Sequence, residues 1–137
     1  MVHGSCLCGG VRFEADDIAI MTHCHCSMCR KALGAAFGTF AHTEHDKFRY
    51  VEGEDRIARY ESSAGNQRGF CRTCGSSVPV QDRMRPSVPI PAGTLDDDPG
   101  VRPVLHIFTG SKAPWWSIDD GLPQFEEWTP GYQPARP

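Results

Sequence analysis

Seven cysteines in three short clusters constrain this 137-residue chain more than any other feature of its sequence. Thiolates at such close spacings are typical of metal sites. Along the chain the clusters are Cys6 with Cys8, then Cys24, Cys26 and Cys29, then Cys71 with Cys74. A structural zinc needs four protein ligands, whereas a zinc that takes part in chemistry keeps one position open for water or substrate. The seven sulfurs therefore predict one closed site of four cysteines and one open site of three.

Disulfides are the main alternative use of these cysteines. An odd number leaves one thiol unpaired, and nothing in Met1–Phe13 resembles an export signal. Cys6 and Cys8 are also too close for an unstrained bridge. We therefore expect a cytoplasmic, reducing location, where thiol clusters usually bind metal or do redox work. Zinc, two ions per chain, is the expected metal because it is redox-silent and favours tetrahedral sulfur, although copper(I) and iron–sulfur clusters use the same ligands.

The position of glycine indicates which cysteines share an ion. Cys8 and Cys74 are each followed by glycine, whose freedom at positive φ lets the chain curl and aim N–H groups at sulfur. These two segments are expected to form one structural zinc site and to close a loop of about sixty residues, which favours the folded state. The four ligands of this predicted site are Cys6, Cys8, Cys71 and Cys74.

The remaining cysteines, Cys24, Cys26 and Cys29, lie within six residues of one another. So compact a chelate can hold one face of a tetrahedral ion and leave the opposite position bare. We expect these three residues to form the open, catalytic zinc site. The alternative is a closed structural site in which His23 or His25 is the fourth ligand, although His25, between two ligands, is expected to point away.

Composition limits the remaining possibilities. A chain with 39% hydrophobic and 23% charged residues is expected to form one soluble domain. Its apolar runs are too short to span a membrane, and its scattered Lys and Arg, at a formal charge of −3, form no basic stripe for nucleic acid. We therefore expect neither a membrane nor a nucleic-acid partner. The aromatic pair Trp115–Trp116 is expected to pack in the core or to cover the sheet, and if exposed it could support a homodimer.

The fold is expected to be mainly β, because β-branched and aromatic runs alternate with turn residues. A hairpin is expected between Lys47–Val51 and Arg56–Tyr60, one helical turn over Ser27–Leu33, and a domain over residues 2–125 with a Pro-rich tail over 126–137. Fourteen glycines and eleven prolines make long helices improbable. Further strands are expected at Val11–Glu14, Phe37–Phe40 and Val104–Phe108.

Three segments resemble the signatures of the glutathione-dependent formaldehyde-activating enzyme family, which includes centromere protein V. They are Gly4–Val11, Cys24–Lys31 and Phe70–Ser76. Ala92–Asp97 and His106–Trp116 resemble later segments of that family, and three cysteine motifs in order with the right gaps are highly specific. The resemblance spans about Gly4–Phe125. It implies a β-tent fold similar to Mss4, built around two zinc sites, with the structural ion on the first and third motifs and the catalytic ion on the second.

The function expected at the open site is carbon–sulfur bond chemistry. A thiol such as glutathione, bound at the open position, has its pKa lowered and reacts as a thiolate. Attack on formaldehyde gives an S-hydroxymethyl adduct, and the reverse step cleaves the same bond. The sequence therefore predicts a zinc-dependent carbon–sulfur lyase or synthase, similar to S-(hydroxymethyl)glutathione synthase, whose partner is a small-molecule thiol. The alternatives are a non-catalytic thiol carrier, an interaction module, or a redox-labile zinc store.

Helper residues are expected among the cations and histidines. Glutathione carries two carboxylates, so Arg30 and Lys112 are the candidate substrate-binding residues, with Lys31 as a further cation. The alkoxide formed by adduct formation needs a proton. The candidate donors are His23, His25 and His42.

Overall fold

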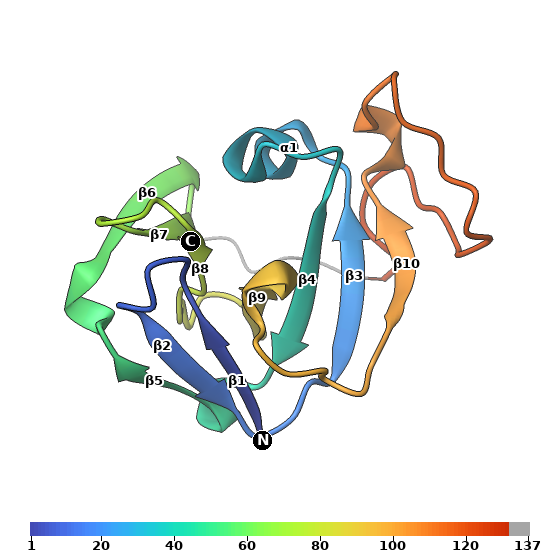
Figure 1. The fold of residues 1–137 in the computed structure, drawn as a ribbon. Helices are drawn as coiled ribbons and strands as arrows, with labels where there is room; N and C mark the ends of the chain where they lie inside the picture. Colours follow the sequence, from blue (N-terminus) through green and yellow to red (C-terminus); the bar gives the residue numbers. More distant parts are fainter. Residues whose placement is uncertain (132–137) are drawn as a thin grey trace.

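Short strands dominate the molecule. A computed structural model describes residues 1–131. In this part of the chain ten strands form three small sheets, and one seven-residue α-helix stands at the end of one of them (Figure 1). This confirms the mainly β prediction and the absence of long helices from the described residues. The β-tent name itself stays a prediction. No helix within residues 1–131 is both long enough and apolar enough to span a membrane.

The first sheet is an antiparallel set of three strands with one face on the core. In β2, Phe13 and Ala15 are buried whereas Arg12 is exposed, which is the alternation expected of a half-buried strand. Gly4 lies across the ring of Phe13, and a Cβ at Gly4 would stand 2.2 Å from that ring. Only glycine therefore allows β1 to pass there. The sheet comprises β1 (Val2–Ser5), β2 (Arg12–Ala15) and β5 (Phe48–Glu52) in the order β1-β2-β5.

The second sheet carries the helix and forms the other wall of the core. β10 runs parallel to β3, while β4 and β9 are antiparallel additions. Its strands are β3 (Ile20–Cys24), β4 (Gly38–Thr43), β9 (Val88–Pro91) and β10 (Pro103–Ile107), in the order β10-β3-β4-β9. The main core lies between the first and second sheets, and its buried members are Val2, Phe13, Ala15, Ile18, Met21, Ala41, Phe48, Val88 and Ile90.

Helix α1 (Ser27–Leu33) has the predicted bounds. It begins where the side chain of Cys26 accepts a hydrogen bond from the Cys29 N–H, and it ends at Gly34, which is left-handed with φ 61°. The helix stands at the end of β3, so the residues just before it lie at one end of the second sheet (Figure 1).

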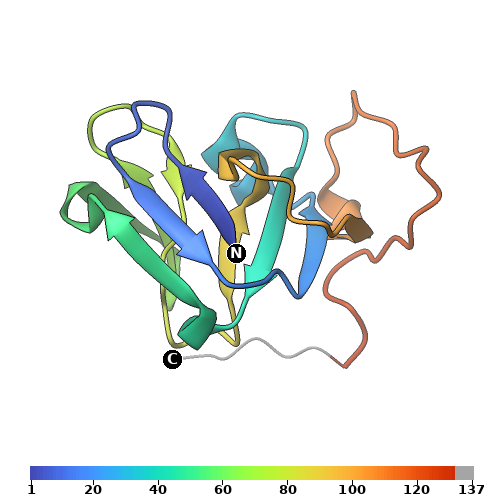
Figure 2. The same cartoon turned by 60° about the horizontal axis from the view of Figure 1, so that its bottom comes forward.

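The third sheet shows that the predicted hairpin is wrong. β6 (Ile57–Ser63) pairs with β7 (Asn66–Cys71), and β7 pairs with β8 (Ser77–Val78), whereas β5 pairs with β2 in the first sheet. Gly53 is left-handed with φ 75°, and a Cβ there would stand 1.9 Å from the Gly10 carbonyl oxygen. This tight crossing and a short 3₁₀ helix redirect the chain from the first sheet into the third (Figure 2).

The segment after β10 runs as a long loop along the edge of the second sheet (Figure 1). Trp115 and Trp116 are 70% and 41% exposed, so the expectation that they pack in the core is wrong. The Phe108 N–H donates to the Glu127 carbonyl, and Trp128 meets the Phe108 ring edge-on. The domain boundary at 125/126 stays a prediction, and residues 132–137 of the expected tail lie outside the described residues.

Candidate metal centres and the adjoining groove

The four cysteines of the first and third motifs come together as expected; we call them the four-cysteine cluster. Their sulfur atoms lie within 4.8 Å of one another. The Cys6 and Cys8 Sγ atoms are 3.5 Å apart, and those of Cys8 and Cys71 are 3.8 Å apart. Four sulfurs bound tetrahedrally at about 2.3 Å from zinc are about 3.8 Å apart. This donor set therefore fits a closed zinc site made of Cys6, Cys8, Cys71 and Cys74.

Two turns aim backbone and hydroxyl donors at this cluster. Gly9 and Gly75, the glycines that follow Cys8 and Cys74, are left-handed with φ 74° and 77°. The Val11 N–H lies 3.2 Å from the Cys6 Sγ. The Ser76 hydroxyl lies 3.3 Å from the Cys74 Sγ, and this hydrogen bond lowers the pKa of Cys74 to about 5. Such donors favour thiolates, the form that metals require.

Cys24, Cys26 and Cys29, the three-cysteine cluster, come from one turn of chain. Cys24 ends β3, Cys26 caps α1 and Cys29 lies in its first turn, which brings the three sulfurs within 4.8 Å. The Cys29 N–H donates to the Cys26 Sγ at 3.2 Å. Hydrogen bonds from the Cys24 and Cys29 thiols hold the pKa of Cys26 well below its usual range. The three sulfurs of this cluster can therefore bind one face of a metal cation.

Neither adjacent histidine belongs to the three-cysteine cluster. The His25 side chain is fully buried and its Nε2 lies 2.8 Å from His106 Nδ1. His23 Nδ1 lies 2.8 Å from the Thr39 hydroxyl. In the part of the chain that the structure describes, the donor atoms grouped at this cluster are the three sulfurs alone. This arrangement agrees with an open site rather than one closed by histidine.

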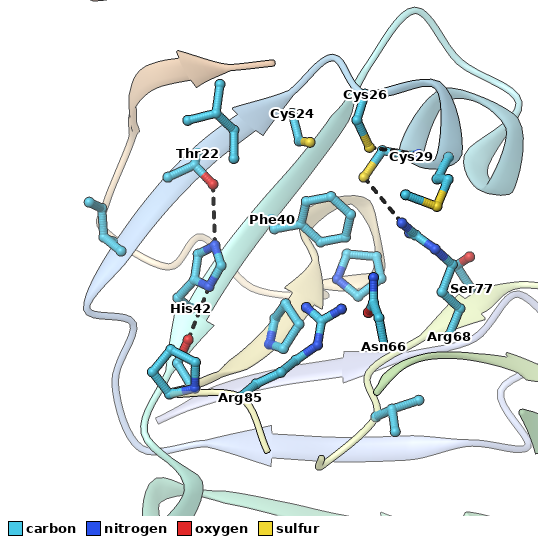
Figure 3. Close-up of a pocket in the computed structure, with 18 of the residues that line it drawn as sticks. Thr22, Cys24, Cys26, Cys29, Phe40, His42, Asn66, Arg68, Ser77 and Arg85 are labelled. Atoms are coloured by element: carbon cyan, nitrogen blue, oxygen red, sulfur yellow. Dashed lines mark hydrogen bonds between the residues drawn. The ribbon is translucent and has the colours of Figure 1, made fainter. Parts of the chain in front are cut away.

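A groove of about 510 Å³ opens beside the three-cysteine cluster, between the second and third sheets. Figure 3 shows Cys24, Cys26 and Cys29 at one end and the Arg68 guanidinium reaching towards them from β7. The Arg68 Nη2 lies 3.6 Å from the Cys29 Sγ. Arg85 enters the same groove from the loop before β9 (Figure 3). Much of the remaining wall is apolar and includes Ile20, Phe40, Val78, Val80, Leu105 and Ile107.

His42 is the one predicted proton donor that lines the described groove. Its Nε2 and Nδ1 lie 3.2 Å from the hydroxyls of Thr22 and Ser87 respectively. Burial, together with the charge of Arg85, lowers the pKa of His42 to about 4. The imidazole is therefore neutral at pH 7 and serves as a fixed polar group.

The cations expected to bind substrate are placed elsewhere. Arg30, Lys31 and Lys112 are not among the residues that line the groove. Lys112 Nζ instead donates to the carbonyls of Ala113 and Trp116. These hydrogen bonds stabilise the loop that contains Lys112 itself.

Arg68 and Arg85 were not predicted as site residues from the sequence. The one usable signal was that Arg68 lies on the strand leading into Cys71, three residues before a predicted ligand. Nothing local marks Arg85.

The chain is similar to several known proteins. The family described as glutathione-dependent formaldehyde-activating enzyme matches residues 1–111. A Halomonas elongata protein, named provisionally as such an enzyme, is 27% identical over 128 residues, which cover 87% of this chain and 82% of the relative. An uncharacterised lyase of Schizosaccharomyces pombe is 29% identical over 76 residues, or 55% of this chain and 53% of the lyase.

A solved structure adds to the agreement. The crystal structure of a Rhodobacter sphaeroides protein is 28% identical with a TM-score of 0.59, and the likeness spans 70% of this chain and 89% of that one. The family match covers most of the chain and includes all three cysteine motifs. This chain belongs to the glutathione-dependent formaldehyde-activating enzyme family.

Proposed function

We propose that this protein is a zinc-dependent carbon–sulfur lyase or synthase that handles glutathione, or a similar thiol, and a small aldehyde. One observation carries the proposal: a cluster of three sulfurs stands at the end of a groove that also holds two arginines. The names of the relatives, an enzyme that activates formaldehyde with glutathione and a lyase, support the same chemistry. The cytoplasmic location and the homodimer stay predictions.

The three-cysteine cluster provides a docking point for sulfur. Cys24, Cys26 and Cys29 would hold the zinc, and zinc bound by these three sulfurs would supply a positive charge that lowers the pKa of an incoming thiol. The Cys29 N–H and the Arg68 guanidinium both donate to sulfur in this cluster. They stabilise its negative charge, and the Arg68 guanidinium reaches the cluster from the groove (Figure 3).

The groove orients the thiol through charge. Glutathione carries two carboxylates, and Arg68 and Arg85 present guanidinium groups that pair with carboxylates through charge-assisted hydrogen bonds. Arg68 is near the sulfurs, whereas Arg85 lies further along the groove, beside His42 (Figure 3). Charges at two points along the groove hold an extended dicarboxylate thiol with its sulfur at the cluster.

The bond-forming step needs only modest help from the protein. The thiolate sulfur attacks the carbonyl carbon, a carbon–sulfur bond forms, and the carbonyl electron pair moves to oxygen, which then takes a proton from water. In the reverse step the hydroxyl proton leaves, the carbonyl reforms and the carbon–sulfur bond breaks. His42 is neutral at pH 7, so it orients groups in the groove rather than acting as a cationic acid.

The test measures turnover directly. Zinc-loaded protein is mixed with glutathione and formaldehyde, and adduct formation is followed by NMR against a protein-free control. Acceleration that saturates with glutathione supports the proposal. Saturable thiol binding without acceleration would instead establish a carrier, an alternative supported by the neutral state of His42 at pH 7.

A further inference from the structure

A third cluster of donor side chains lies outside the groove and has no part in the proposed reaction. The donor atoms of His23, His106 and Asp120 lie within 4.8 Å of one another. β3 and β10 run side by side, and their register places His23 opposite His106. The two imidazoles stack with ring centroids 4.7 Å apart and an angle of 30° between planes. Two histidines from neighbouring strands therefore meet one carboxylate from the loop after β10.

Each imidazole has one nitrogen fixed by a protein partner. His23 Nδ1 lies 2.8 Å from the Thr39 hydroxyl, and His106 Nδ1 lies 2.8 Å from His25 Nε2. The Nε2 atom is thus the ligand nitrogen that each ring can offer. Metal-binding histidines almost always have their second nitrogen fixed in this way, because that bond sets the tautomer and the ring orientation.

The carboxylate is also held in place. Asp120 Oδ1 accepts the Leu122 N–H at 3.0 Å, which leaves Oδ2 directed at His106 Nε2 at 2.8 Å. His106 is 2% exposed, whereas the Asp120 side chain is 41% exposed. The cluster therefore has a buried imidazole on one side and a solvent-exposed carboxylate on the other. An ion can enter from the side of the carboxylate.

An aromatic wall borders the two histidines. Phe37 meets His23 edge-on, with centroids 4.8 Å apart, and Trp116 meets Phe37 at 5.7 Å. An apolar border of this kind strengthens the attraction between a cation and its ligands by limiting access of water.

We propose that His23 Nε2, His106 Nε2 and the Asp120 carboxylate form a third metal site, which takes a divalent ion of the zinc class. Two imidazoles and one carboxylate are borderline-hard donors suited to zinc, cobalt and similar divalent ions, unlike the all-sulfur donors of the two cysteine clusters. Metal–ligand distances of about 2.0–2.2 Å require the donor atoms to converge slightly. The half-exposed Asp120 carboxylate can make part of that movement by turning about Oδ1, the oxygen that accepts the Leu122 N–H.

The competing explanation is a metal-free hydrogen-bond chain in which Asp120 orients His106 and His106 orients His25. The two explanations differ in metal content. The protein is first loaded with two equivalents of zinc per chain, which fill the two cysteine clusters, and is then titrated with cobalt(II). A third site of nitrogen and oxygen donors adds one cobalt per chain with weak d–d absorption and without the strong sulfur-to-cobalt bands that binding at cysteine produces.

Variants locate this extra ion. Asp120→Asn should abolish the additional equivalent, while Asp119→Asn, the same charge change on the neighbouring exposed residue, should keep it. Thr39→Val removes the partner of His23 Nδ1 and should weaken cobalt binding about 10–100-fold. Absence of cobalt binding by the zinc-loaded wild type, or equal binding by Asp120→Asn, would overturn the proposal. Neither result depends on whether the three-cysteine cluster reacts with a thiol.

Discussion

The four-cysteine and three-cysteine clusters use the same ligand atoms but are assembled in opposite ways. The first joins Cys8 to Cys71, 63 residues further along the chain, and thereby ties the first sheet to the third. The second is supplied by a single turn between β3 and α1 and lines a groove. This difference indicates that a cluster of distant cysteines stabilises the fold. A cluster of neighbouring cysteines can leave one coordination position open without lowering the stability of the fold. Substitutions in each cluster test this difference between a structural role and a functional role.

Cys71→Ser should have the largest effect, because Cys71 is fully buried and links distant parts of the chain. Structural zinc contributes roughly 10–16 kcal/mol to the folding of small zinc domains. We expect the free energy of unfolding to fall by more than about 5 kcal/mol, measured by urea denaturation followed by circular dichroism. A variant that remains as stable as the wild type would show that the four-cysteine cluster does not support the fold.

Cys26→Ser should remove function while sparing the fold. Serine is itself a favoured N-cap, so α1 keeps its cap. Zinc content should fall by about one ion per chain relative to the wild type, measured by atomic emission, and saturable glutathione binding should be lost.

Cys26→Ala provides the matched control for the capping role. It should lose the same zinc and be destabilised by a further ~1 kcal/mol, because the cap is lost as well. A zinc content equal to that of the wild type, with unchanged thiol affinity, in Cys26→Ser would contradict the proposed open site.

Arg68→Gln should raise the dissociation constant for glutathione about tenfold, which corresponds to roughly 1.4 kcal/mol. 2-Mercaptoethanol has no carboxylate, but the variant also lacks the guanidinium beside the cluster sulfurs, so its affinity should fall by less than that of glutathione, as measured by calorimetry. Arg59→Gln, on the exposed face of β6, is the matched control and should bind both thiols normally. An equal loss of affinity for the two thiols would assign Arg68 to the sulfur cluster rather than to a carboxylate.

His42 should make the fold sensitive to mild acid. Burial lowers the pKa of His42 to about 4, below its ordinary value of 6.5. The unfolded chain therefore takes up this proton first, and stability that is present above pH 6.5 is lost as the pH falls towards 4. Between pH 6.5 and 5.5 this loss amounts to about 1 kcal/mol.

The measurement compares His42→Gln with the wild type by urea denaturation at both pH values, so that acid effects on the cysteines cancel. The variant should lose about 1 kcal/mol less than the wild type over that interval. Equal losses in the two proteins would show that His42 is protonated as readily in the folded state as in the unfolded one.

Local features of the molecule were predictable from the sequence. The cysteine grouping and the bounds of α1 depend on close spacings, on glycine after a cysteine and on a short run free of proline. The strands β4 and β10 were predicted for the same reason, since aromatic and β-branched residues are recognisable within a few positions.

Features that depend on distant contacts were not predictable. Turn residues between Val51 and Arg56 suggested a hairpin, but Gly53 packs against Gly10, a contact that no local pattern reveals. Arg85 reaches the groove from a loop, and His106 meets His25 across 81 positions. Pairing at such separations is decided by which sheets pack together, so neither the arginine groove nor the histidine cluster was visible in the sequence.

The grouping of distant cysteines in one cluster has a consequence for synthesis of the chain on the ribosome. The turn that carries Cys6 and Cys8, between β1 and β2, emerges first, yet Cys71 follows 63 residues behind Cys8. At ordinary elongation rates this interval is roughly 3 to 13 seconds. During that time the N-terminal thiols are exposed to oxidants and to competing metal ions, so the nascent chain depends on a reducing environment before the mature protein does.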